Sequence, residues 1–327
     1  MNSFIRETGR DRYFAALEQE LDELLDPETG MLSEQFSRLI DCPLCGSGDH
    51  RQLFVKRGYT FVRCRECRLV FANPQVDEAR AIDRYGSSMS AELWTEVLLS
   101  ERQLELDRPK FEAIAAELEP FRGKGRLLDV GCSIGLFLDV ARQRGFDGTG
   151  IEFGERALRH ARDELGLAVL DVPLADAGFD PERFDVVTVL SVLEHVNDPR
   201  AMLREVGRVL KPGGALYLIV PNLESLACRV LHQHAATFDG RNHLVYFSPA
   251  SLADALRREG FEPLRVSTHV SSLDPVLAWL AYEDPYGAAD VAEDPLVAAA
   301  EQRRTDLEAW LEQFQLGYKL HCLATKG

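Results

Sequence analysis

Two glycines and an acid, on either side of a short helix-forming stretch, are the residues whose spacing first indicates chemistry. The segment LLDVGCSIG (127–135) is an apolar strand that runs into a glycine turn, and GTGIEF (148–153) is a second short strand with Glu152 near its end. Gly131 and Gly135 let backbone approach a ligand where a Cβ would collide. The N-terminus of the intervening helix offers N–H groups to a carboxylate or phosphate, and Glu152 can accept two hydrogen bonds from ribose hydroxyls. This order of elements predicts a βαβ unit that holds a nucleoside.

Three ligand classes fit this turn unequally. A dinucleotide site needs G-x-G-x-x-G, but Ser133 and Leu136 occupy its second and third glycine positions. A serine hydrolase elbow needs G-x-S-x-G, which the turn matches with Ser133 as the nucleophile. However, elbows follow several earlier strands, which the sequence does not show, and they give no role to an acid after the next strand. S-adenosylmethionine (SAM) sites commonly begin D-x-G-x-x-x-G, and Asp129, Gly131 and Gly135 have that spacing. We therefore favour SAM.

The elements that follow the turn have the order expected of a larger parallel sheet. FDVVTVL (184–190) is an apolar, β-branched run typical of a central parallel strand. SVLEHVNDP and an amphipathic helix come next, VLKPGG (209–214) ends that helix, and LYLIVPN (216–222) is another strand. Taken together, the phrases DVGCSIG, IE, FDVV, LEHV and LKPGG resemble the class I SAM-dependent methyltransferases over about residues 100–270.

This resemblance implies an α/β, Rossmann-like core. We expect a seven-stranded, mainly parallel sheet with helices on both faces, in which 261–269 forms strand six and 316–326 forms the antiparallel strand seven. A helical insertion at about 271–315 would separate these two strands. Such an insertion either covers the acceptor site and shapes its specificity or forms a dimer surface.

The resemblance also implies which residues hold the donor. From the methionine end to the adenine, the expected contacts come from Gly131, Ser133, Gly135, Asp129 (amino group, directly or through water), Glu152 (ribose), Phe153 and Val172 (adenine faces) and Asp171 (adenine amino group). Family members often carry a G-D or G-T pair near Asp171, which this chain lacks. Tyr85 resembles a tyrosine that closes over the donor, and ordinary packing explains it equally well.

An acid–histidine pair is the candidate for the chemical step. Glu194 and His195 follow strand 184–190 at the carboxyl edge, where open α/β sheets bind ligands. A hydroxyl acceptor must lose a proton near the moment of attack, and His195 titrates near neutrality, so it is the base candidate. In related O-methyltransferases the matching pair often lies at the acceptor and sometimes at a divalent metal. The alternative is that the pair only stabilises the turn.

RNHLVYFSPASL (241–252) is the second candidate segment. It resembles the phrase that opens the last core helix of this family, with Ser248 as N-cap and Pro249 in the first helical position. These structural roles leave His243 and Tyr246, which precede the helix, unexplained. We assign both to the acceptor pocket, with simple packing as the equal alternative.

Four of the seven cysteines have the spacing of a zinc site. Cys42 and Cys45 form one C-x-x-C pair and Cys64 and Cys67 another, with eighteen residues between the pairs. Four thiolates fill every position of a tetrahedral ion and leave none for water, so this Zn²⁺ would be structural. It would stabilise a ribbon of about 35 residues that is too small to hold a core alone.

The ribbon also carries a resemblance. CPLCGS followed by KRGYTFVRCRECRLVFANPQ is similar to the zinc ribbon ahead of many bacterial sugar and polysaccharide methyltransferases. The implied function is O-methylation of a hydroxyl on a sugar, glycan precursor or secondary metabolite. One alternative is an RNA methyltransferase whose ribbon grips RNA, because similar ribbons precede some ribosomal RNA methyltransferases. Another is a non-catalytic SAM-binding or zinc-ribbon interaction protein.

Four consecutive parts follow from these motifs. They are an N-terminal helical segment (1–40), a zinc ribbon (41–75), a helical linker (76–120) and a SAM-binding methyltransferase domain (121–327). In the first part, Tyr13 to Ile40 has the pattern of an amphipathic helix broken near Pro27 and Gly30. Its leucine stripe suits either packing or a homodimer contact.

Composition limits the class of partner. With 327 residues, 46% of them hydrophobic, the chain can bury a large core. The formal charge of −16, from 53 acids against 37 bases, repels phosphate backbones and argues against nucleic acid. No apolar run reaches the roughly 18 residues needed to span a bilayer, and the charged N-terminus is unlike a signal peptide. We therefore expect a cytoplasmic protein acting on a small-molecule or saccharide acceptor.

Overall fold

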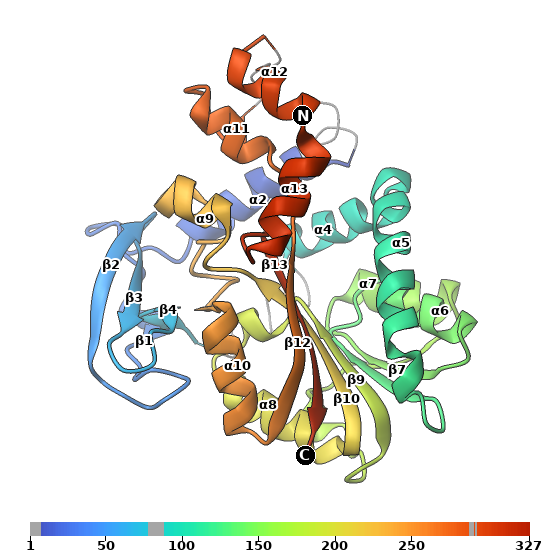
Figure 1. Cartoon of the computed structure of the whole chain (residues 1–327). Helices are drawn as coiled ribbons and strands as arrows, with labels where there is room; N and C mark the ends of the chain where they lie inside the picture. The colour runs from blue at the N-terminus through green and yellow to red at the C-terminus, as the bar shows by residue number, and fades with distance from the viewer. Residues whose placement is uncertain (1–7, 78–87, 288–290, 292) are drawn as a thin grey trace.

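A seven-stranded sheet forms the centre of the computed structural model, which describes residues 8–77, 88–287, 291 and 293–327 (Figure 1). Its strand order is β12-β13-β10-β9-β6-β7-β8. The strands are β6 (Arg126–Val130), β7 (Asp147–Ile151), β8 (Ala168–Leu170), β9 (Phe184–Leu190), β10 (Leu210–Pro221), β12 (Phe261–His269) and β13 (Lys319–Lys326). β13 runs antiparallel to both its neighbours, whereas the pairs from β10 to β8 are parallel. The expected α/β, Rossmann-like fold is confirmed.

Helices cover both faces of this sheet because successive strand residues point to opposite sides. Leu127 of β6 belongs to a core that also contains residues of α5 (Glu101–Leu118) and α6 (Leu136–Gln143). The next residue, Leu128, belongs to the core formed with α8 (Pro199–Val209) and α10 (Pro249–Arg258). β9 is buried on both sides over almost its whole length, as its apolar sequence predicts.

The helix that opens at Pro249 has the start expected from its sequence. Ser248 is the N-cap of α10, and its side chain and that of Ser251 form a capping box, with Pro249 in the first turn. Shorter elements complete this part of the chain. They are η2 (Glu119–Phe121), α7 (Glu155–Arg159), the π-helical turn η3 (His160–Glu164), η4 (Leu174–Asp176), η5 (Leu193–His195), α9 (Leu226–Leu231) and η6 (His232–His234).

The cysteine-rich segment forms part of a second sheet, with the order β11-β4-β3-β2. Its strands are β2 (His50–Lys56), β3 (Tyr59–Cys64), β4 (Val70–Ala72) and β11 (Val245–Tyr246). β11 comes from the segment just before α10, so the methyltransferase part of the chain supplies the edge strand of the ribbon sheet. Phe71 of the ribbon lies in the same core as Leu128 of the central sheet. The ribbon is therefore built into the larger fold.

The N-terminal segment differs from the expectation of two helices. α2 (Arg10–Asp22) forms, but after the break the described residues contain only the 3₁₀ turn η1 (Glu34–Phe36) and β1 (Ser37–Arg38), which pairs with β5 (Gln75–Val76). Asp26 accepts hydrogen bonds from the backbone N–H groups of residues 28 and 29, a turn that competes with helix. Leu17 and Leu21 are buried against the ribbon, which favours the packing explanation of the leucine stripe.

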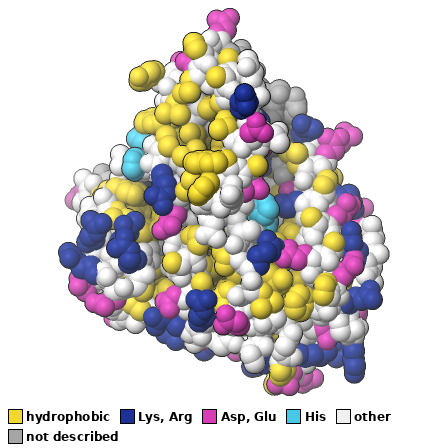
Figure 2. All heavy atoms as spheres, in the orientation of Figure 1, with side chains coloured by type: hydrophobic (Ala, Val, Ile, Leu, Met, Phe, Trp, Pro, Cys, Tyr) yellow, Lys and Arg dark blue, Asp and Glu magenta, His cyan; other side chains and the backbone are white. Residues whose placement is uncertain are grey.

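Two further groups of helices occur in the sequence, one after the ribbon and one between β12 and β13. α4 (Met89–Leu99) leads into α5, and α11 (Asp274–Leu280), α12 (Pro295–Gln302) and α13 (Arg304–Gln313) form the expected insertion between β12 and β13. The insertion has a small core of its own. Figure 2 shows hydrophobic side chains gathered over it, and Trp279, Trp310 and Phe314 are among its exposed residues. Within the described part of the chain, no helix combines the length and apolarity that a membrane span requires.

Candidate functional site

The glycine turn is held against the end of β7. The N–H groups of Gly131 and Cys132 both donate to the carbonyl of Ile151, at 2.8 and 2.9 Å. Gly131, Ser133 and Gly135 have positive φ angles of 76°, 50° and 80°, so the turn needs the left-handed region three times. α6 begins directly afterwards, and its first N–H groups therefore lie at the mouth of the turn.

The two glycines are required for a reason that the sequence did not reveal. A Cβ at Gly131 would lie 2.4 Å from Cγ2 of Val192, and one at Gly135 would lie 2.6 Å from Cδ1 of Leu167. Protein packing, together with the backbone angles, therefore already excludes a side chain at both positions. Val192 belongs to the loop that carries Glu194, so Gly131 lets the donor turn and that loop approach closely.

Glu152 lies at the end of β7 and faces the turn. Its Oε2 accepts from the Ser133 N–H at 2.8 Å, and its Oε1 accepts from the N–H groups of Phe153 and Gly154 at 2.8 and 2.7 Å. Burial raises the pKa of this carboxyl, and the three backbone N–H groups oppose that rise. An ionised carboxylate has about four acceptor sites. Three are occupied, so Oε2 can accept from one ribose hydroxyl without breaking any of these bonds, and not from the two expected from the sequence.

Asp129 lies beneath the turn, as expected from its place in β6. Its side chain is 1% exposed, and Thr188 Oγ1 donates to Oδ1 at 2.6 Å. Burial raises the pKa of Asp129 to about 7, and the negative charge of Glu152 adds to the rise, although the Thr188 hydrogen bond opposes it. Thr188 was not predicted from the sequence, where its one signal is a polar residue within an otherwise apolar central strand.

The remaining residues expected to contact SAM differ in their exposure to solvent. Phe153 is half-buried beside the core, next to Glu152. Asp171 and Val172 follow β8; Asp171 is exposed, and Arg162 forms an ion pair with it at 3.3 Å. The structure thus brings the turn, Glu152, Phe153 and the end of β8 to one edge of the sheet. Tyr85 lies outside the described residues.

The acid and histidines from two distant segments do meet. Single ligand atoms of Glu194, His195 and His243 all lie within 4.8 Å of one another. Glu194 is 1% exposed, neither of its carboxylate oxygens has a hydrogen-bond partner, and burial raises its pKa. The two imidazole rings meet edge to face, with centroids 4.8 Å apart. An unpartnered buried carboxylate is costly, so this cluster is a candidate functional site.

Each histidine is oriented by a backbone carbonyl. His195 Nδ1 lies 2.8 Å from the carbonyl oxygen of Asn242, and His243 Nδ1 lies 2.9 Å from that of Thr237. A carbonyl can only accept, so Nδ1 carries the proton in both neutral rings and Nε2 is the proton-accepting atom. Both rings are therefore held in the tautomer that a general base at Nε2 requires.

Lys319, at the start of β13, is a second residue near this site that was not predicted from the sequence. Its Nζ donates to Ser191 Oγ at 3.2 Å, burial lowers its pKa, and the charge of Glu194 opposes that fall. Lys319 thus places an amine close to the buried carboxyl group of Glu194. A lysine that opens an apolar strand was the available signal, but nothing in the sequence placed that strand beside Glu194.

Tyr246 occupies a different environment from His243. Its side chain is buried against Phe61 of the ribbon and against Phe238, and its hydroxyl donates to the His243 carbonyl at 2.5 Å. This geometry favours the packing alternative for Tyr246. Through its hydroxyl it still supports the backbone of His243.

The four paired cysteines converge as a closed metal site requires. Sγ of Cys42 lies 3.4 Å from that of Cys67, and Sγ of Cys45 lies 3.5 Å from that of Cys64. All four sulfur atoms lie within 4.8 Å of one another. A tetrahedral ion with Zn–S bonds of about 2.3 Å separates its sulfurs by about 3.8 Å. The donor set and spacing therefore fit Zn²⁺.

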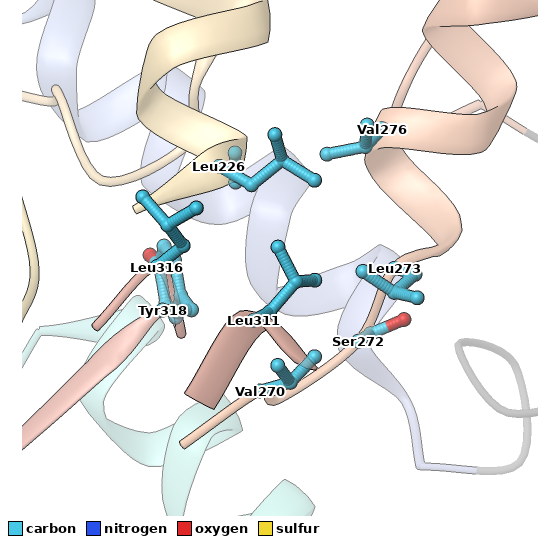
Figure 3. A pocket seen from close by; sticks show the side chains of 9 residues that line it. Leu226, Val270, Ser272, Leu273, Val276, Leu311, Leu316 and Tyr318 are labelled. Atoms are coloured by element: carbon cyan, nitrogen blue, oxygen red, sulfur yellow. The ribbon is translucent and has the colours of Figure 1, made fainter. Parts of the chain in front are cut away.

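An apolar pocket lies between the helical insertion and α9 (Figure 3). Leu226 of α9, Val276 of α11 and Leu311 of α13 point towards one another across it, and Leu316 and Tyr318 close the side next to β13. Tyr318 directly precedes Lys319, so the pocket lining reaches the start of β13.

Comparison with known proteins identifies the family of this chain. A family model described as "Methyltransferase domain" matches residues 100–266. The chain therefore belongs to the class I SAM-dependent methyltransferase family. A magnesium protoporphyrin IX methyltransferase from Synechocystis PCC 6803, solved with bound S-adenosylhomocysteine (SAH), shares the fold with a TM-score of 0.50 at 17% identity, over 77% of this chain and 100% of that one.

Two curated relatives are similar over a shorter stretch. The ubiquinone biosynthesis O-methyltransferases of Stutzerimonas stutzeri and Pseudomonas aeruginosa (strain UCBPP-PA14) are 38% and 40% identical to this chain over 103 residues. That stretch is 30% of this chain and 44% of each relative, so the chain spans less than half the length of these relatives.

Proposed function

We propose that this chain transfers the methyl group of SAM to a hydroxyl oxygen of a small-molecule acceptor. The observation that carries the proposal is the meeting of Glu194, His195 and His243 at the sheet edge that also holds the glycine turn. The relatives named as O-methyltransferases support an oxygen acceptor. Their names refer to ubiquinone biosynthesis and give no support to the sugar or glycan acceptor expected from the ribbon, so the acceptor is proposed only as a hydroxyl compound.

The donor half of the site acts by positioning. We infer that Gly131, Ser133 and Gly135 cradle the methionine end, Asp129 meets its amino group from below, and Glu152 accepts from a ribose hydroxyl at the acceptor site left on Oε2. The sulfonium already activates the methyl group. Holding an oxygen in line near 3 Å from that carbon can therefore supply several kcal/mol of the barrier reduction.

The acceptor half moves the proton. His195 Nε2 is the proposed base, because the Asn242 carbonyl holds the proton on Nδ1. The buried Glu194 carboxylate, with its nearest oxygen 3.9 Å from His195 Nε2, stabilises the imidazolium that forms. His243 presents a second Nε2 to the same space and can orient the acceptor hydroxyl by accepting from it.

The zinc ion is proposed as structural. Four thiolates saturate a tetrahedral ion, so it offers no coordination site to an acceptor. Its proposed role is to fix the ribbon strands, one of which pairs with β11 next to His243.

The direct test is turnover with ¹⁴C-methyl SAM and a panel of hydroxyl compounds, analysed for methyl ethers. We expect label in a small-molecule ether, and no label in total RNA supplied as a competing acceptor. SAH binding without transfer to any hydroxyl, amine, carbon or RNA acceptor would instead identify a non-catalytic donor-binding protein.

A further inference from the structure

Three segments that are distant in sequence meet at the peptide of Leu244, directly after His243. The N–H of Leu244 donates to the carbonyl of Glu194 at 2.8 Å, which ties its segment to η5. The carbonyl of Leu244 accepts from the N–H of Ala72 at 2.9 Å, which ties it to the ribbon. The candidate acceptor site therefore contains a structural contribution from the end of the ribbon.

One side chain from the ribbon connects both histidine segments. Gln75 is fully buried, with 0% of its surface exposed. Its Nε2 donates to the Leu244 carbonyl at 3.4 Å, and its Oε1 accepts from Asn197 Nδ2 at 3.0 Å. Leu244 is one residue from His243, and Asn197 is two residues from His195. The side-chain amide of Gln75 thus spans the gap between the two segments.

The backbone next to Gln75 makes this span rigid. Asn197 Nδ2 also donates to the carbonyl of Val76 at 2.9 Å, and β5 is paired with β1. The backbone at Gln75 is therefore fixed, and Gln75 cannot shift together with either histidine segment. A buried amide in this position fixes the two segments at one separation, because moving either of them would leave a polar group without a partner.

We propose that Gln75 is a positioning residue that sets the relative placement of the His195 and His243 rings. The expected effect on methyl transfer rests on the proposed function, whereas the effect of Gln75 on the positions of the two rings does not. Since these rings form the acceptor half of the site, losing the span should impair transfer and leave SAM binding, which depends on the glycine turn and Glu152, unchanged.

The test uses the full-length, zinc-loaded chain with SAH and ¹⁵N-histidine NMR. His195→Gln and His243→Gln spectra assign the two rings. In Gln75→Met, which keeps the length of the side chain but not its donor or acceptor, we expect shifted ring resonances and altered titration midpoints for both histidines, with unchanged SAH affinity. With any acceptor found in the screen, kcat should fall about 10- to 100-fold, as expected for a misplaced catalytic group.

Gln75→Glu provides a conservative rescue with a pH signature. A protonated carboxyl can still donate to the Leu244 carbonyl and accept from Asn197, whereas a carboxylate cannot donate. At low pH, where the introduced carboxyl is protonated, the histidine resonances should match those of the unmodified chain at the same pH. They should depart from them as the pH rises and that carboxyl ionises.

Gln103→Met is the matched control. Gln103 is also buried, accepts from Arg10 and donates to Asp107, each at 2.8 Å, but it lies on α5. It should lower thermal stability without moving the His195 or His243 resonances. Unchanged resonances in Gln75→Met, or equal changes in Gln103→Met, would overturn the proposal. A chain that binds no SAH while Gln75→Met still moves both rings would refute the proposed function and leave this inference standing.

Discussion

The donor and acceptor halves of the site are assembled in opposite ways. The donor half comes from one continuous stretch, in which β6, the glycine turn, α6 and β7 follow one another and Glu152 hydrogen-bonds to Ser133. The acceptor half is assembled from η5, from the segment before β11 and from the ribbon, through hydrogen bonds that join residues 72, 194 and 244. The local half has a sequence signature, whereas the dispersed half depends on the complete fold.

The two halves also differ in how they stabilise a buried carboxyl group. The Glu152 carboxylate receives three backbone N–H groups from its own neighbourhood, whereas both oxygens of Glu194 lack a partner and Lys319 lies nearby only because β13 runs beside β10. Buried groups whose pKa is shifted by burial and by a nearby charge cluster at functional sites. We therefore expect that changes in one half of the site leave the other half intact.

The largest expected effect concerns the ribbon. We expect metal analysis to find one zinc ion per chain, and Cys64→Ser/Cys67→Ser should remove it. Cys228→Ser, which alters a buried cysteine outside the two C-x-x-C pairs, should retain the zinc. Structural zinc contributes about 10 kcal/mol or more in small domains, so the thermal unfolding midpoint should fall steeply. Full zinc content in the double variant would show that Cys64 and Cys67 are not zinc ligands.

The next effect separates the halves by function. His195→Ala should lower turnover about 10²- to 10⁴-fold, the range typical of a lost general base, with SAH affinity unchanged. His234→Ala is the control, because His234 stacks on Trp279 outside the cluster. Steady-state kinetics at saturating acceptor measure the difference, and equal turnover in both variants would exclude His195 as the base.

A third effect concerns the burial of Asp129. Between pH 4 and 7 the folded chain retains a proton that the unfolded chain has released, so ionising this carboxyl destabilises the fold as the pH rises. The change in pKa from 3.8 to about 7 corresponds to about 4 kcal/mol. Asp129→Asn, which can still accept from Thr188, should therefore be more stable than the unmodified chain at pH 8 by up to that amount and equal to it near pH 4. Urea unfolding at the two pH values tests this, and a pH-independent difference would contradict it.

The smallest effect is on donor affinity. Glu152→Ala should weaken SAH binding by about 100-fold, since a charge-assisted hydrogen bond contributes about 1.5–3 kcal/mol. Asp171→Ala, at the exposed end of β8, should weaken it less. Isothermal titration calorimetry gives both values, and full affinity in Glu152→Ala would contradict the ribose role.

The features that could be predicted from the sequence are those determined by residues close together in the chain. The turn at Gly131, the place of Glu152 after the next strand and the cap at Ser248 could be predicted because each depends on local backbone geometry or hydrophobic periodicity. The seven-stranded sheet was expected from the resemblance to a known family. The pairing of β4 with β11, the span made by Gln75 and the position of Lys319 could not be predicted, since each joins residues more than a hundred positions apart. The helix expected after the break near Pro27 and Gly30 was wrong, because residues 37–38 form β1 and pair with β5, a contact between residues distant in sequence.

The measurement closest to the central claim is a crystal structure of the chain soaked with SAH. We predict that the nucleoside lies along the Gly131–Gly135 turn, with a ribose hydroxyl within hydrogen-bond distance of Glu152 Oε2 and the sulfur facing His195. A folded chain whose turn stays empty at saturating SAH, or a nucleoside bound elsewhere, would contradict it.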